Sequence, residues 1–194
     1  MPMSDPMRED APYFEAVGRL LTEYASAEAA AHMFARHLSG MPDDRARIVF
    51  SGMRLGELAD RIRQMMRLAL EDQDEKLDES FQDADACLSQ LGIIADRRQR
   101  LVHRHVSYSS AALHATNALT SKTFTAAERD VFTLPDLEAM RADCVVIYMR
   151  FVYLRDSRVK KAYFLPDQHE YIYGPWRYKF VPPNPPKAKR QKAP

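Results

Sequence analysis

Apolar residues recur at steps of three and four in four long segments of the chain, and this spacing constrains the fold more than any other feature. Residues spaced in this way lie on one face of an α-helix, and that face has to be covered by other helices. The pattern predicts an all-α fold: a four-helix up-down bundle with a short β-hairpin or irregular excursion after the third helix and an extended C-terminal tail. The first stripe consists of Phe14, Val17, Leu21, Tyr24, Ala31, Ala35 and Leu38.

The other three helices have stripes of the same kind. The third helix is expected to begin near Asp78, and the fourth to begin after Thr133 as N-cap and end around Asp156. Pro42 and the two acids after it predict either a turn or a new helix start. The predicted inner faces are Leu55, Leu58, Ala59, Ile62, Met65, Met66 and Ala69; Phe81, Ala84, Leu88, Leu91, Ala95 and Val102; and Leu137, Met140, Cys144, Ile147, Tyr148, Phe151 and Leu154.

A chain of 194 residues is long enough for one compact domain with tails. We expect a disordered lead-in over residues 1–9, the bundle over 10–156, an aromatic strap over 157–181 and a disordered basic tail over 182–194. The strap is expected to pack on the bundle or on a partner. Its aromatic residues alternate with Arg and Lys, so the alternative is that they stack on nucleic-acid bases.

Charge and cysteine usage limit the classes of protein that remain. No apolar run approaches the roughly 20 residues that span a bilayer, and the first ten residues lack a signal-peptide core. Cys87 and Cys144 fall inside helical patterns, which predicts a cytoplasmic protein with reduced, buried thiols and no membrane contact. The formal charge is +1, and four cations of the last segment contribute to it, so the rest of the chain carries −3. That balance argues against a basic nucleic-acid coat.

Four arginines and two histidines crowd the end of the third predicted helix, in the segment ADRRQRLVHRHV over residues 95–106. Arg98 falls on the core stripe, roughly 140° around the helix from His103. A purely structural interpretation is an Asp96–Arg100 ion pair, a surface His103 and an Arg98 that reaches round the edge of the bundle. The positions that share one helix face are Asp96, Gln99, Arg100 and His103.

The string from Arg98 to His103 resembles the R-polar-x3-H motif of HEPN domains, small helical bundles in which it commonly reads RNxLVH late in a long helix. Gln99 replaces the usual asparagine with a longer amide, and Arg104 stands where glycine is often found. The similarity extends loosely over residues 12–156. It implies a metal-independent endoribonuclease that acts as a homodimer, often a toxin or phage-defence effector, with RNA as substrate and an antitoxin protein as a further partner.

The resemblance also implies roles for individual residues. Arg98 and His103 are the expected catalytic pair, and Gln99 and Arg100 are expected to position substrate. Cleavage of RNA without a metal or cofactor needs proton exchange near neutral pH and positive charge on the phosphate, which histidine and arginine supply. Because Arg98 and His103 point apart on one helix, the site would be completed across a two-fold axis by a second copy of the chain.

Two carboxylates are expected to support this site. Asp96 shares the helix face of His103, and Glu28 interrupts the apolar stripe of the first helix as Arg98 interrupts that of the third. Because an unpaired buried charge is expensive, we expect Glu28 and Arg98 to pair across the bundle. Two other interpretations stay open: a zinc pair made by His103 and His105, and a catalytically inactive bundle that binds a nucleotide, RNA or a protein partner.

Overall fold

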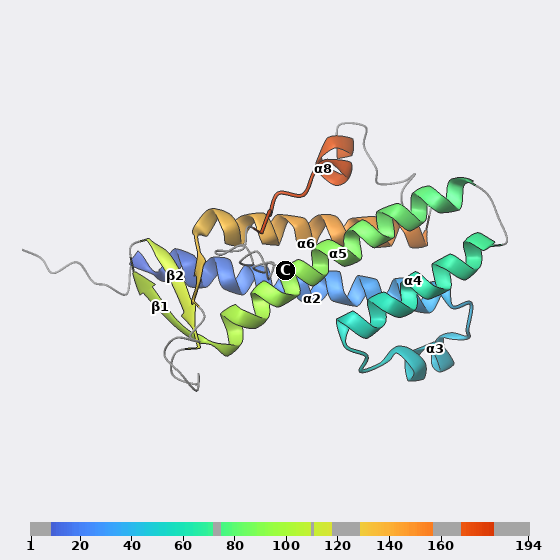
Figure 1. Cartoon of the computed structure of the whole chain (residues 1–194), viewed down its shortest axis with the longest axis horizontal. Helices are drawn as coiled ribbons and strands as arrows, with labels where there is room; N and C mark the ends of the chain where they lie inside the picture. The colour runs from blue at the N-terminus through green and yellow to red at the C-terminus, as the bar shows by residue number, and fades with distance from the viewer. Residues whose placement is uncertain (1–8, 72–74, 110, 118–128, 157–167, 181–194) are drawn as a thin grey trace, which may run out of the picture.

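The computed structural model of the chain describes residues 9–71, 75–109, 111–117, 129–156 and 168–180 (Figure 1). These ranges form a mainly α-helical fold with six helices and one small antiparallel sheet of three strands. The helices are α2 (Ala11–Leu38), α3 (Asp43–Phe50), α4 (Leu55–Glu71), α5 (Glu75–His103), α6 (Leu134–Arg155) and α8 (His169–Tyr173). The strands are β1 (His105–Ser109), β2 (Ala112–Thr116) and β3 (Arg129–Phe132).

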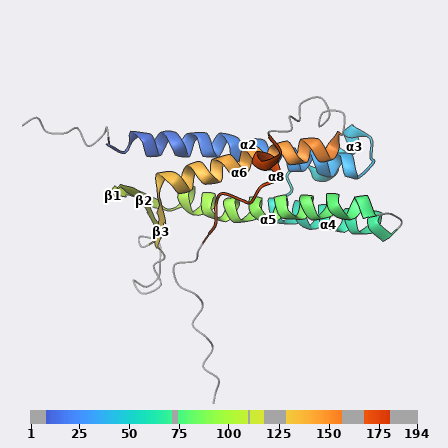
Figure 2. The same ribbon diagram turned by 90° about the horizontal axis from the view of Figure 1, so that it is seen from above.

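The four longest helices lie side by side in two layers (Figure 2). One layer contains α2 and α6, which contact each other more extensively than any other two elements, and the other contains α4 and α5. The sheet lies at one end of this helical body, where α2 and α6 begin and α5 ends, and α3 lies at the opposite end (Figure 1). The molecule therefore has two distinct ends, and each is built from helix termini.

The buried face of α2 is rotated from the predicted stripe. Phe14 was expected inside but is 53% exposed, whereas the adjacent Tyr13 is buried. Five alanines lie on the buried face of α2, and their small side chains let α6 approach closely. The position of α6 thus determines which residues of α2 are buried. The residues of α2 that are buried are Tyr13, Ala16, Leu20, Tyr24, Ala27, Ala30, Ala31, Phe34 and Ala35.

The buried face of α5 also departs from the prediction, but only towards its C-terminal end. The predicted positions step by about seven residues per two turns, whereas a straight α-helix needs 7.2, so the stripe drifts by roughly 20° per heptad. By the end of the helix Val102 has moved out to 43% exposure, while Arg97 and Leu101 are buried. The heptad pattern therefore selected Arg98 as the inward arginine, and the most buried one is its neighbour Arg97.

The start of α6 follows the prediction closely. Thr133 is the N-cap: its Oγ1 accepts from the Asp136 backbone N–H at 3.2 Å, and Asp136 Oδ2 accepts from the Thr133 backbone N–H at 3.1 Å. This reciprocal pair is a capping box that satisfies two otherwise unpaired backbone donors. The helix ends at Arg155 with Asp156 as its C-cap, as expected. One predicted inner residue, Tyr148, is instead 40% exposed.

The excursion after α5 is a sheet in the order β1-β2-β3. The expected hairpin is β1 with β2, in a register that pairs His105 with Thr116, and β3 was not predicted. The Tyr13 hydroxyl donates to the carbonyl of Ala111 in the hairpin turn, which ties the sheet to the start of α2. In β3, Asp130 and Phe132 are buried while their neighbours are exposed, so one face of this strand is turned inward.

Residues 168–180 pack on the helical body through two buried polar side chains. Asp143 of α6 accepts from the backbone N–H groups of Arg177 and Tyr178 at 3.0 and 2.9 Å, and from Gln90 Nε2 at 2.9 Å. Arg150 donates to the carbonyls of Ile172 and Gly174, and its Nη1 lies 2.9 Å from Asp83 Oδ1. The strap is not wholly extended as expected, because α8 forms one helical turn within it.

Several predictions fall on residues outside the described ranges: the lead-in up to residue 8, the segment 118–128, the first part of the strap and the basic tail. Cys87 and Cys144 are buried and not bonded to each other, and burial raises the pKa of Cys144 to about 12. Within the described part of the chain, each helix is too short or too polar to cross a bilayer.

Candidate functional site

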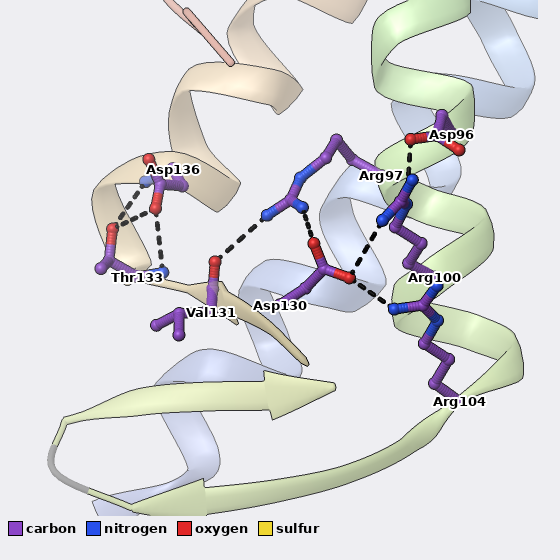
Figure 3. A network of polar contacts seen from close by, with 8 residues as sticks. All are labelled: Asp96, Arg97, Arg100, Arg104, Asp130, Val131, Thr133 and Asp136. Carbon is purple, nitrogen blue, oxygen red and sulfur yellow. Dashed lines mark hydrogen bonds and ion pairs between the residues drawn. The ribbon is translucent and has the colours of Figure 1, made fainter. Parts of the chain in front are cut away.

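Two arginines of the last turns of α5 and a third just after its end converge on one buried carboxylate (Figure 3). Asp130 of β3 is 4% exposed, and Arg97 Nη1 donates to its Oδ1. Arg104 Nη1 lies 2.6 Å and Arg100 Nη1 3.4 Å from the other oxygen, Oδ2. Arg97 and Arg100 are three positions apart and share a helix face, and Arg104 follows directly after the last residue of α5, so all three guanidinium groups reach β3. We call these four residues the Asp130 cluster.

Arg97 is the most buried of the three arginines in the Asp130 cluster. Its Nη2 donates to the carbonyl of Val131 at 3.1 Å, and its guanidinium lies 4.2 Å from the ring centroid of Phe132 and 4.9 Å from that of Phe180. Ion pairing, a backbone acceptor and two aromatic faces offset the loss of water around this charge, and only its buried Nε has no hydrogen-bond partner among the described residues. Arg97 is therefore a structural anchor that joins α5, β3 and the strap.

The predicted Asp96–Arg100 ion pair is present, with Oδ2 and Nε 3.0 Å apart. Arg100 is thus shared between exposed Asp96 and buried Asp130 (Figure 3). Burial lowers the pKa of Arg100, but the two carboxylates raise it more, so the net shift is upward. With Asp96 included, three guanidinium groups lie against two carboxylates among the described residues.

The predicted ion pair between Glu28 and Arg98 is wrong: within the described residues no ion pair joins them. The side chain of Tyr24 lies between the two, with its hydroxyl 3.4 Å from Glu28 Oε1 and its ring centroid 5.3 Å from the Arg98 guanidinium carbon. Burial raises the pKa of Tyr24, Glu28 adds to that rise and Arg98 opposes it. The buried Nε of Arg98 has no hydrogen-bond partner.

The remaining predicted site residues are at the surface. Gln99 and His103 are exposed, and so is His105 at the start of β1. The structure therefore brings Asp96 and Arg100 together and adds Arg97, Arg104 and Asp130, which were not predicted. It does not bring Arg98 to His103 within one chain: Arg98 faces α2, and no hydrogen bond between the two side chains is found in the described residues.

A cavity of about 340 Å³ lies beside the Asp130 cluster, between β3 and the strap. Two exposed cations, Arg129 and Lys179, line it, and neither has an acidic partner among the described residues. The lining also includes Asp130 and Asp136, whose carboxylates are engaged by the arginines of the cluster and by the Thr133 cap. Phe180 and Tyr178 add aromatic surface, and burial raises the pKa of Tyr178. This combination of free cations and aromatic rings is suited to a phosphate and a planar ring.

One sequence signal could have identified Arg97: it lies three residues after Ile94 and four before Leu101, on the buried stripe of α5. Asp130 carries no such signal, because its partners are 26 to 33 residues away in sequence.

Among the residues that the structure describes, no three His, Cys, Asp or Glu side chains gather as metal ligands would, so His103 and His105 have no third member. The chain matches no family model, no curated protein and no solved structure.

Proposed function

We propose that the protein is a metal-independent endoribonuclease of HEPN type that acts as a homodimer, with the exposed His103 as the group that exchanges protons. The observation that carries the proposal is the position of His103: it is exposed at the end of α5, one turn beyond Arg100 and beside the guanidinium groups of the Asp130 cluster. A phosphodiester drawn to their charge would come within reach of the imidazole.

The Asp130 cluster contributes positioning in this proposal. Its arginines are already fixed on a buried carboxylate, so little conformational freedom is lost when an anion approaches. Arg129 and Lys179 extend the positive surface to the neighbouring cavity, where the RNA backbone can continue. Gln99, exposed on the same side of α5 as His103, supplies an amide that can donate to a phosphate or a base.

Arg98 is the second catalytic residue of the proposal, and it acts from the other copy of the chain. Arg98 is half-exposed between α5 and α2, and its guanidinium group lies over the ring of Tyr24. The Nε of Arg98 has no hydrogen-bond partner in the described part of the chain. In a two-fold dimer the Arg98 of one protomer would stabilise the pentacoordinate phosphate while the His103 of its partner transfers the proton. The proposal includes an up-down four-helix bundle, for which the mutual packing of α2, α4, α5 and α6 is the support.

The decisive experiment is cleavage of labelled RNA in the presence of a metal chelator. The wild-type chain is expected to cut, and His103→Ala and Arg98→Ala are each expected to lower the rate about 100-fold or more, as loss of a proton-transfer group or of transition-state charge does. His105→Ala is the matched control, since this exposed histidine lies two residues away and is expected to leave the rate unchanged.

Mixing the two inactive variants tests the shared site. A mixed dimer of Arg98→Ala and His103→Ala chains has one site with both residues intact, so random exchange of subunits is expected to restore about a quarter of the wild-type rate. Recovery to that level would support a site built from two chains. No cleavage by the wild-type protein, or cleavage that survives His103→Ala, would contradict the enzyme proposal.

A second candidate function is a catalytically inactive bundle that binds RNA. One observation favours it: Arg97, Arg100 and Arg104 are already engaged by Asp130, and Arg98 is stacked on Tyr24. Salt-dependent RNA binding without cleavage, weakened by Arg129→Ala or Lys179→Ala, would establish this alternative.

A further inference from the structure

A second group of arginines lines a cavity at the other end of the molecule, where α2 and α6 end and α3 begins (Figures 1 and 2). The cavity has a volume of about 330 Å³. Its charged lining includes Arg36 from α2, Arg47 from α3 and Arg155 from α6, and its apolar lining includes Met33 and Met41. Two consecutive helices and α6, which is distant from them in sequence, thus direct guanidinium groups to one cavity.

These arginines have too few acidic partners. Asp43 is the one carboxylate in the lining of the cavity; its Oδ2 lies 2.7 Å from Arg47 Nε, and its Oδ1 lies 4.0 Å from Arg36 Nη1. Arg155 has no acidic partner in the described ranges, and its Nη1 instead lies 3.3 Å from the Met33 sulfur. A thioether is a weak acceptor. Three guanidinium groups against one carboxylate leave two positive charges at the cavity.

Two helix ends reduce this excess without removing it. Arg36 and Arg155 lie in the last turns of α2 and α6, where each helix end contributes roughly half a negative charge. Even with both helix ends counted, about one positive charge remains uncompensated. The Nε of Arg36 is also buried and has no hydrogen-bond partner. The arrangement therefore suits an anion that can accept several hydrogen bonds at once.

We propose that this cavity binds a phosphate monoester dianion that carries an apolar or aromatic group. A phosphate monoester has a charge of roughly −1.5 to −2 at pH 7 and three acceptor oxygens, so it can neutralise the remaining positive charge and accept from several guanidinium groups, which donate in parallel pairs. The methionines form the apolar side of the cavity, and thioether sulfur contacts aromatic rings favourably. The site is independent of the proposed ribonuclease activity, because it uses neither His103 nor the Asp130 cluster.

Isothermal titration of the full chain with phenyl phosphate tests the proposal. Saturable one-to-one binding is expected, about tenfold tighter than binding of inorganic phosphate, which lacks the apolar group. Arg155→Gln and Arg36→Gln are each expected to weaken binding about tenfold or more. Asp43→Asn is expected to tighten it a few-fold, because it removes the competing carboxylate.

Arg67→Gln is the matched control: it removes one exposed arginine from α4, and binding is expected to stay within twofold of wild type. Far-ultraviolet circular dichroism establishes that each variant is folded, and the two arginine variants test the site separately if one of them is not. Absence of saturable binding at millimolar phenyl phosphate, equal affinity for inorganic phosphate, or equal loss of affinity in Arg67→Gln and Arg155→Gln would overturn the proposal.

Discussion

The two ends of the molecule both gather three arginines around one carboxylate, but the carboxylates differ in burial. The Asp130 side chain is 2% exposed, and all three of its arginines contact it. The Asp43 side chain is 66% exposed and contacts two arginines of its group, while the third, Arg155, rests on a methionine sulfur. The same residue types thus give a closed network at the sheet end and an open one at the α3 end.

This difference shows that burial of the anion, rather than the number of arginines, determines what the arginines can do. A buried carboxylate fixes its partners, because separating them would leave charges without water. An exposed carboxylate binds its partners weakly and can be replaced by a stronger anion. We therefore assign a structural role to the contacts within the Asp130 cluster. We assign ligand binding to Arg129 and Lys179, which lie beside the cluster, and to the arginines at the α3 end.

Removal of the buried charge is expected to have the largest effect. Asp130→Asn leaves Arg97 buried without its counter-charge, and breaking a buried ion pair in this way typically costs about 3–5 kcal/mol of unfolding free energy. Urea denaturation followed by circular dichroism measures this loss. Asp96→Asn is the control, since it removes an exposed carboxylate from the same arginines and is expected to cost about 0.5 kcal/mol or less. Equal losses in the two variants would refute the distinction between them.

The corresponding change at the other end is expected to be small. Asp43→Asn removes an exposed ion pair and a favourable acid in the first turn of α3, which together contribute about 1 kcal/mol or less. The same denaturation experiment measures it. A loss as large as that of Asp130→Asn would mean that the α3 end is also a closed structural network.

The smallest expected effect is a dependence of stability on pH at the α3 end. Burial lowers the pKa of His32 below its ordinary value, Arg36 lowers it further, and Glu28 and a hydrogen bond to the Phe50 backbone oppose the shift. Because the unfolded chain binds the proton more readily, the contribution of His32 to stability is complete above about pH 6.5 and decreases as the pH falls below that value.

His32→Gln is therefore expected to reduce the loss of stability between pH 7.5 and 5.5, as measured by the urea midpoint. His37→Gln serves as the control, because this histidine is exposed on the same helix and is expected to leave the loss unchanged. An identical loss in wild type and His32→Gln would exclude a role for this side chain.

The sequence predicts where the helices lie in the chain better than which face of each helix is buried. Thr133 and Asp136 form a local capping box whose partners are three residues apart, so the start of α6 could be read from the chain. The buried face of α2 could not, because Tyr13 and Phe14 are both large and apolar and only the position of α6 decides between them. The third strand was missed because β3 has only four residues.

The candidate site shows the same limit. The Asp96–Arg100 pair follows from helical spacing within one turn, whereas the contact between Arg97 and Asp130 joins residues 33 positions apart across a sheet that was not fully predicted. Glu28 and Arg98 were expected on inner helix faces, and both are half-buried rather than buried. Their proposed ion pair failed because the intervening Tyr24 separates them, and side-chain packing between helices is not visible in a sequence pattern.

The contacts that anchor the strap determine the order in which parts of the protein can fold during translation. Gln90 and Asp143 are synthesised well before Arg177 and Tyr178, whose backbone groups complete their hydrogen bonds. Until the strap emerges from the exit tunnel, Gln90 and Asp143 can bond to each other, but the acceptor positions that Arg177 and Tyr178 fill are open only to solvent. The helices can therefore pack together before the strap is synthesised, but the helices and the strap can unfold as one cooperative unit only after translation has passed residue 178.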